Sequence, residues 1–293
     1  PPYQADLCIQ DGKIVAISPQ WEGNCRTRVD VTGKIVSPGF IDIHTHSDTC
    51  PFSAVFPESK VAQGITLEIV GNCGVSAVPI LPSCQAEQTA YLRKISEIPV
   101  PEEAVRDASV QKYAAHVAQT GYPSHLGTLI GQGTLRAGIV GFQDRPLTPS
   151  EMEQMKFLLD DQLNQGALGL SLGLIYPPGS FSPTSELREL ARVVQKHKKI
   201  LAVHMRNEGP NIFQAVEEML SIAEETGVHL HISHLKLMGK AQWGQAPRLL
   251  ERIEASRQRG AVVTCDQYPY TATSTILAAL LPRRAYDGGS AAM

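Results

Sequence analysis

The sequence predicts an α/β protein built from parallel βαβ units, and two observations support this fold class. Short apolar runs that end in polar residues alternate with amphipathic stretches along most of the 293 residues. Strands that alternate with helices in this way form parallel sheets, as in a doubly wound sheet or a (β/α)8 barrel. The composition is that of a globular protein, since 43% of the residues are hydrophobic and 19% are charged. A chain of this length can bury the core of one large barrel or of two smaller domains.

The first predicted element is a hairpin in residues 6–17, which read DLCIQDGKIVAI. The pair Asp11-Gly12 lies between two β-prone runs and is a strong short-range signal for a hairpin turn. We interpret this hairpin as the edge of a small β domain.

Seven later segments carry the apolar run of a strand. They are GFIDIH, GITLEIVG, HLGTLIG, GALGLSLGL, KILAVHM, HLHISHL and AVVTCDQY.

Two helices between these segments have recognisable ends. One begins at TPSE, where Thr148 can cap, Pro149 takes the first helical position and Glu151 completes a capping box. The other occupies residues 211–226, and Gly227 follows it as a C-cap candidate. Its apolar side chains recur every three or four residues: Ile212, Val216, Met219, Leu220 and Ala223.

Histidines gather at the carboxyl ends of the predicted strands, where parallel α/β folds place their chemistry. Side chains alternate along a strand, so His44 and His46 project to the same face, as two ligands of one ion must. In HLHISH the same alternation separates His234 from His229 and His231, which leaves those two as packing or surface residues. Four of the nine histidines lie at or just beyond a strand end: His44, His46, His204 and His234.

A single strand-end histidine is more often a satisfied polar residue than a ligand, but four in one βα protein favour a metal site. A catalytic zinc takes three protein ligands and leaves a position for water. Cys73 is a further candidate, because it follows a predicted strand and is flanked by Gly71 and Gly74, which let the backbone turn. The alternative for Cys73 is a buried, inert thiol.

These motifs together resemble the amidohydrolase superfamily. SPGFIDIHTHSD is similar to its strand-one signature, and the His-x-His pair alone is shared with dihydroorotases, hydantoinases and deaminases. GNCGVS, GALGLSLGLIYPPG, HMRNEG, HISHLK and DQYPYTA together resemble the N-acyl-D-amino-acid deacylase branch over nearly the whole chain.

The resemblance implies a (β/α)8 TIM-type barrel beside a small β domain built from both chain ends. We assign residues 1–37 to part of that small domain and residues 38–293 to the barrel, which here contains strands one to seven. In the family, zinc is held tightly at the positions that match Cys73, His204 and His234. His44, His46 and a strand-eight Asp would form a weaker or second metal position. The cysteine stands where other amidohydrolases have a carboxylated lysine or a glutamate.

The resemblance also implies a site for the substrate carboxylate at the positions that match Lys236, Tyr268 and Ser274. Arg206 lies beside a ligand and is a further candidate, with a salt bridge to Glu208 as the alternative. The implied reaction is zinc-dependent hydrolysis of the amide bond of N-acyl-D-amino acids, giving a carboxylate and a free D-amino acid. The implied partner is therefore a small N-acyl amino acid.

The sequence departs from the family pattern in two ways. Gln132 stands where many members have a histidine after the third strand. The segment with strand eight and its general-base Asp is expected beyond Met293, and the first strand of the small domain is expected before the first residue; neither Asp42 nor Asp266 matches that base. We therefore expect the 293 residues by themselves to be inactive or nearly so while retaining three zinc ligands.

Two other functions remain open at this point. A cyclic amidase of the dihydroorotase or hydantoinase type should carry a lysine at the end of strand four, where this chain reads SLGLIY. A non-catalytic scaffold homologue would be expected to have lost metal ligands, and the five candidates are all present.

Charge and composition exclude several partners. A net charge of −3 and a pI near 6.3 give no electrostatic attraction for nucleic acid. No apolar run approaches the ~18 residues of a membrane-spanning helix, and no secretory signal pattern begins the sequence. The six cysteines are scattered, which favours reduced thiols. The expected compartment is therefore the cytoplasm.

Overall fold

The computed structural model describes residues 3–53, 58–93, 108–276 and 279. The chain divides into two compact units, Pro1–Gly39 and Phe40–Met293. This division falls close to the predicted boundary between residues 37 and 38.

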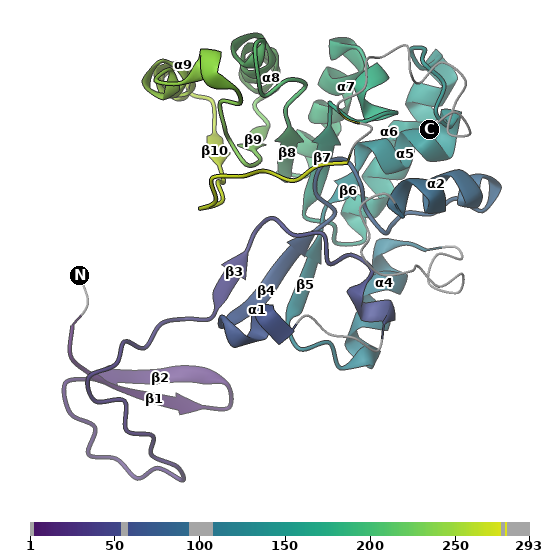
Figure 1. Cartoon of the computed structure of the whole chain (residues 1–293). Coiled ribbons are helices and arrows are strands. Elements are labelled where there is room, and N and C mark those ends of the chain that lie inside the picture. Colours follow the sequence, from purple (N-terminus) through teal and green to yellow (C-terminus); the bar gives the residue numbers. More distant parts are fainter. Residues whose placement is uncertain (1–2, 54–57, 94–107, 277–278, 280–293) are drawn as a thin grey trace. The chain divides into compact units, whose positions relative to one another are not determined.

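The first unit contains the predicted hairpin (Figure 1). Strands β1 (Asp6–Gln10) and β2 (Lys13–Ser18) pair antiparallel. Asp11 and Gly12 connect them with φ angles of 50° and 72°, the left-handed conformation that a two-residue hairpin turn requires. The hairpin prediction is confirmed.

The second unit is built on two sheets whose pairings are all parallel. The order is β3-β4-β5 in one sheet and β6-β7-β8-β9-β10 in the other. The two sheets meet at Leu129, the single residue between β5 and β6, whose backbone N–H donates to Val70 O at 2.9 Å. Consecutive strands are therefore neighbours throughout, as in a (β/α) barrel, and the predicted barrel of strands one to seven is confirmed. The bounds are β3 (Phe40–Asp42), β4 (Ile65–Val70), β5 (His125–Thr128), β6 (Ile130–Gly131), β7 (Gly169–Gly173), β8 (Ile200–His204), β9 (His229–Ile232) and β10 (Val263–Cys265).

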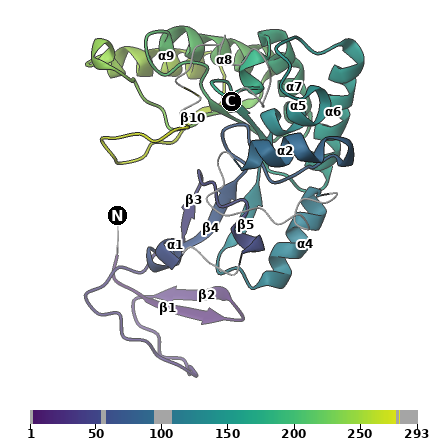
Figure 2. The same cartoon turned by 45° about the vertical axis from the view of Figure 1, so that its right-hand side comes forward.

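Helices alternate with these strands. Figures 1 and 2 show α5 to α9 following one another along one side of the five-stranded sheet. The described helices are α1 (Glu58–Ala62), α2 (Gln85–Leu92), α4 (Val110–Thr120), α5 (Gln132–Val140), α6 (Pro149–Asn164), α7 (Thr184–Lys196), α8 (Ile212–Thr226) and α9 (Ala246–Gln258).

Both helix ends predicted from the sequence are confirmed. At α6, Thr148 Oγ1 accepts from the backbone of Glu151 and Glu151 Oε2 accepts from the backbone of Thr148, the reciprocal bonds of a capping box. Helix α8 ends at Gly227, which takes the left-handed conformation with φ 72°.

The core lies between the sheet and the helices. Strand β7 is buried along its whole length, and Leu170 and Leu172 are fully buried. Leu187 and Leu190 of α7 are fully buried in the same cluster. This packing fixes the strand ends that carry the candidate ligands.

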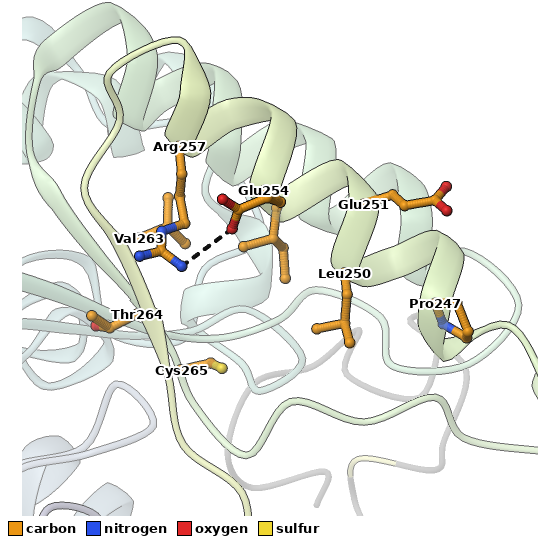
Figure 3. Close-up of a pocket in the computed structure, with 9 residues that line it drawn as sticks. Pro247, Leu250, Glu251, Glu254, Arg257, Val263, Thr264 and Cys265 are labelled. Carbon is orange, nitrogen blue, oxygen red and sulfur yellow. Dashed lines mark hydrogen bonds and ion pairs between the residues drawn. The ribbon is translucent and has the colours of Figure 1, made fainter.

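A pocket lies at the far end of the five-stranded sheet, between α9 and β10 (Figure 3). Its apolar lining includes Leu250, Ile253 and Val263, and Arg257 pairs with Glu254 at 3.3 Å beside it. None of the candidate metal ligands lines this pocket.

None of the helices in the described ranges has both the length and the apolar character that a membrane crossing requires.

Candidate metal centre

The loop after β4 presents Cys73 at the strand ends. Cys73 has φ 53°, and Gly71 and Gly74 on either side have φ 79° and 76°. A Cβ atom at Gly71 would lie 2.1 Å from Leu129 O, and one at Gly74 would lie 2.5 Å from Gly173 N. Only glycine fits these contacts, so the loop turns tightly against β6 and β7 and Cys73 is almost completely buried, with 6% exposed.

Cys73 lies among imidazoles. Its Sγ is 3.4 Å from Nε2 of His44 and 3.5 Å from Nε2 of His234. Burial raises the pKa of the thiol, but the surrounding imidazoles outweigh burial and hold that pKa well below its usual range; they are His204, His234, His44 and His46. The structure thus surrounds Cys73 with imidazoles, of which that of His46 is exposed, and favours the thiolate, the form that binds a metal.

His44 and His46 follow strand β3. Their ring centroids are 5.6 Å apart, and the ring of His44 is 5.0 Å from that of His234. Nδ1 of His44 lies 3.3 Å from Oδ2 of Asp266. Burial lowers the pKa of His44, but hydrogen bonds to Asp266 and Cys73 raise it to about 10.

His204 and His234 share a carboxylate. Nδ1 of His234 is 2.9 Å from Oε1 of Glu208, and Nε2 of His204 is 3.8 Å from the same oxygen. Burial raises the pKa of Glu208, but the hydrogen bond from His234 and the charges of His204 and Lys236 lower it to about 2. Nδ1 of His234 also lies 2.9 Å from Nζ of Lys236, and the Nε2 atom of the same ring faces Cys73.

Among the described residues, two groups of three side chains have ligand atoms that all lie within 4.8 Å of one another, and the two groups share His234. They are His44 with Cys73 and His234, and His204 with Glu208 and His234. His204 is 6% exposed, and neither of its ring nitrogens has a hydrogen-bond partner in the described part of the chain. Buried polar atoms without partners are rare and call for a ligand, and imidazole with thiolate is the donor set that zinc prefers. The residues present therefore fit a zinc ion.

The predicted carboxylate-binding residues are partly assembled beside this centre. Lys236 Nζ donates to Glu208 Oε1 at 2.6 Å and lies 5.5 Å from the centroid of the Tyr268 ring. Ser274 is exposed, and its neighbour Thr275 contacts the hydroxyl of Tyr176 at 2.9 Å.

Arg206 has different partners from those expected. Its Nε donates to Glu218 at 2.9 Å, and its two Nη atoms donate to the carbonyls of Ser180 and Ser182. The alternative of a salt bridge to Glu208 is wrong, because that carboxylate is the partner of Lys236 and His234. Arg206 ties the segment around η3 (Gly179–Phe181) to α8.

Gln132 belongs to a buried network between α5 and α7. Its Nε2 donates to Ser182 Oγ at 2.7 Å and to Glu186 Oε1 at 3.0 Å. Glu186 also pairs with the fully buried Arg136 at 2.6 Å. The glutamine at this position therefore joins the packing of two helices.

Sequence reasoning missed the part that Asp266, His231 and Glu208 play. Oδ2 of Asp266 contacts His44 and also Nε2 of His231 at 2.8 Å, while Oδ1 accepts from the backbone N–H of His234 at 2.5 Å. Asp266 stands directly after β10, so the strand-end rule that found the histidines also applies to it. His231 is buried, as expected for a packing residue, but its ring nitrogen faces this carboxylate.

The fold and this cluster define a metal-binding (β/α) barrel protein. A model of the amidohydrolase family matches residues 27–268. The chain belongs to the amidohydrolase family.

Named relatives refine this similarity. The chain is 35% identical over 277 residues to a D-aminoacylase of Alcaligenes xylosoxydans xylosoxydans, covering 94% of this chain and 56% of the relative. It is 36% identical over 288 residues to an N-acyl-D-glutamate deacylase of the same organism, covering 97% and 56%. The predicted resemblance to the N-acyl-D-amino-acid deacylases is confirmed. The chain spans about half the length of these relatives.

Solved structures agree with the sequence matches. The structure of N-acyl-D-glutamate deacylase from Bordetella bronchiseptica, in complex with zinc and a phosphonate mimic of the tetrahedral intermediate, superposes with a TM-score of 0.83 at 36% identity, covering 92% of this chain and 55% of that one. An L-hydantoinase from Arthrobacter aurescens superposes with a TM-score of 0.58 at 16% identity and shares the fold alone.

Proposed function

We propose that this chain carries the metal site of an enzyme that hydrolyses the amide bond of N-acyl-D-amino acids to a carboxylate and a free D-amino acid. The observation that carries the proposal is the buried side chain of Cys73 among imidazoles, with Lys236 beside His234. Identity of 35% and 36% to two D-amino-acid deacylases supports the substrate class.

We assign a zinc ion to Cys73, His204 and His234, with a second, weaker position at His44 and His46. A bound zinc would supply Lewis acidity for the amide carbonyl and, by acidifying water, a nucleophile at neutral pH. Neither ring nitrogen of His204 has a hydrogen-bond partner among the described residues, which supports its role as a ligand.

The chain's own residues would orient the reacting groups. Glu208 and Asp266 hold the Nδ1 atoms of His234 and His44, so that the Nε2 atoms of both rings face Cys73. The cation of Lys236 and the half-buried Tyr268 would bind the carboxylate of the substrate. A carboxylate fixed at that point leaves only one enantiomer with its acyl carbonyl at the metal. No catalytic base is assigned among the described residues.

The cyclic amidases are the main alternative function. Their sequences should place a lysine after the strand that corresponds to β7, and this chain has Tyr176 in that loop. The aromatic ring of Tyr176 contacts the ring of His204 at 4.8 Å between centroids. The absence of a lysine from SLGLIY argues against a cyclic amidase.

We also place the enzyme in the cytoplasm. All six cysteines are free thiols, including the exposed Cys25 and Cys265, which supports a reducing compartment.

Metal analysis and substrate assays of the protein as its gene encodes it test the proposal. We expect zinc to copurify and N-acetyl-D-amino acids to be hydrolysed in preference to their L enantiomers and to hydantoins. Zinc-loaded protein that opens hydantoins and spares N-acyl-D-amino acids would identify a cyclic amidase, and protein with no affinity for zinc would favour a scaffold.

A further inference from the structure

A second buried polar cluster lies behind His44 and His46, on the opposite face of the same segment. The two histidines face Cys73, while Thr45 and Ser47, which alternate with them, contact Lys60 and Glu68. Thr45 and Ser47 are 7% and 6% exposed. They belong to a group that we call the Glu68 cluster, which consists of Asp42, Thr45, Ser47, Lys60, Glu68, Tyr122 and Ser124.

The centre of this cluster is the carboxylate of Glu68 on β4, which is completely buried. Four donors surround it. Ser47 Oγ and Lys60 Nζ both lie 2.8 Å from Oε2, and Tyr122 OH and Ser124 Oγ lie 3.1 Å and 2.5 Å from Oε1. A buried carboxylate is costly unless charge and hydrogen bonds compensate it, so it is stable only while these donors keep their places.

Lys60 on α1 connects this carboxylate to the segment that carries the histidines. Its ammonium donates to Asp42 Oδ2 at 2.9 Å and also to Thr45 Oγ1. Asp42 Oδ1 accepts from the backbone N–H of His44 at 3.2 Å. The hydroxyl groups of Thr45 and Ser47 lie 2.8 Å apart. The cluster therefore forms hydrogen bonds with residues on both sides of each histidine.

We propose that Glu68 and Lys60 are positioning residues that set the placement of His44 and His46 at the metal centre from the opposite side of the segment that follows β3. The inference rests on the proposed function, in which these two histidines are metal ligands. Among the described residues, no recorded contact joins the Glu68 cluster to Cys73, His204 or His234. Its effect should therefore be confined to the His44 and His46 half of the centre.

The first test compares Glu68→Gln with Glu186→Gln in their affinity for the second, weaker Zn²⁺ ion, the one assigned to His44 and His46. This affinity is measured against a competing chelator after the tighter position has been filled. Glu186 is the matched control, because it also belongs to a buried ion pair, with Arg136, but contacts none of the histidines. We expect Glu68→Gln to weaken binding of this second Zn²⁺ ion by roughly 10-fold or more, as loss of outer partners of a metal ligand does. Glu186→Gln should bind Zn²⁺ like the wild type. Equal affinity in the wild type and Glu68→Gln would overturn the inference.

The second test asks whether the effect acts through the histidines. In a His44→Ala, His46→Ala background, Glu68→Gln should cause no further loss of Zn²⁺ affinity. An undiminished loss in that background would overturn the inference, because the cluster would then act on the whole site or on general stability.

A third test separates a positioning role from simple stabilisation. Lys60→Arg, which keeps the cation, should retain most of the Zn²⁺ affinity that Lys60→Met loses. Ser47→Ala removes one of the hydroxyl groups that donate to Glu68, and it replaces Glu68→Gln in these tests if Glu68→Gln does not fold. No difference in Zn²⁺ affinity between Lys60→Arg and Lys60→Met would contradict the inference.

Failure of the proposed function would be recognised separately. If the wild type binds no Zn²⁺, the proposed metal site is wrong. The placement of the His44 and His46 side chains is then measured in metal-free protein from their imidazole ¹⁵N and ¹H resonances. We expect Glu68→Gln to shift those resonances and to leave the resonances of His204 unchanged. Unchanged His44 and His46 resonances would overturn the inference independently of any metal.

Discussion

The two polar clusters on opposite faces of residues 44–47 differ in how their atoms are satisfied. Both carboxylate oxygens of Glu68 accept from protein donors, whereas the buried ring nitrogens of His204 have no hydrogen-bond partner among the described residues. The first cluster is complete within the protein. The second combines a thiolate with imidazoles and leaves donor atoms for a ligand. Burial of polar residues alone therefore does not mark a functional site; buried polar atoms that lack hydrogen bonds do.

Removal of the Cys73 thiol should cause the largest loss of Zn²⁺ affinity in the second cluster. Cys73→Ser replaces a thiolate with a hydroxyl that stays protonated at neutral pH, so Zn²⁺ affinity should fall at least about 100-fold. Competition with a chromogenic chelator measures this. Cys84→Ser is the matched control, because Cys84 lies in η2 (Pro82–Cys84) outside the recorded ligand groups. Zinc retained by Cys73→Ser at wild-type affinity would contradict the assignment.

Removal of the carboxylate should break the first cluster through stability. Glu68→Ala leaves Lys60 and three hydroxyl groups without their common acceptor, and the loss of one partner from a buried pair costs about 3 kcal/mol of the free energy of unfolding. Urea denaturation of metal-free protein measures this change. A loss below about 1 kcal/mol would mean that water replaces the carboxylate and that the cluster is less closed than its geometry indicates.

The pH dependence of stability should separate Glu208 from an ordinary glutamate. Its pKa is lowered to about 2 in the folded protein from an ordinary value of 4.5, so the unfolded chain takes up the proton first as the pH falls. The stability that this carboxylate contributes is therefore present above pH 4.5 and is lost between pH 4.5 and pH 2. Glu208→Gln should flatten the loss of stability across that range in metal-free denaturation curves. A slope identical to that of the wild type would show that Glu208 is not held by His234 and Lys236.

A peripheral change should affect neither cluster. Thr148→Ala removes the side-chain cap of α6 and should cost about 1 kcal/mol of unfolding free energy. Zn²⁺ affinity should stay at the wild-type value. A change in Zn²⁺ affinity would mean that metal binding follows global stability, and the contrast between the two clusters would lose its meaning.

Much of the fold follows from the sequence because strands and helices leave a local pattern. Each of the seven apolar runs contains a strand, and the capping box of α6 reads directly from Thr148 and Glu151. The break at Leu129 could not be predicted, because it depends on the backbone bond to Val70 from a neighbouring strand.

The site was predictable where position along a strand decides it. Cys73, His204 and His234 follow from the strand-end rule, and the structure brings them together. The roles of Glu208 and Asp266 were not predicted, because both carboxylates contact histidines that are distant in sequence. Glu208 reaches His234, and Asp266 reaches His44 across 222 positions. The bond from Arg206 to Glu218 likewise depends on how α8 packs.

X-ray absorption at the zinc edge of the zinc-loaded protein determines whether Cys73 binds the ion. If Cys73 and histidines hold the ion, the spectrum requires one sulfur neighbour at about 2.3 Å and nitrogen neighbours at about 2.0 to 2.1 Å. A first shell of nitrogen and oxygen alone, with no sulfur, would contradict the account.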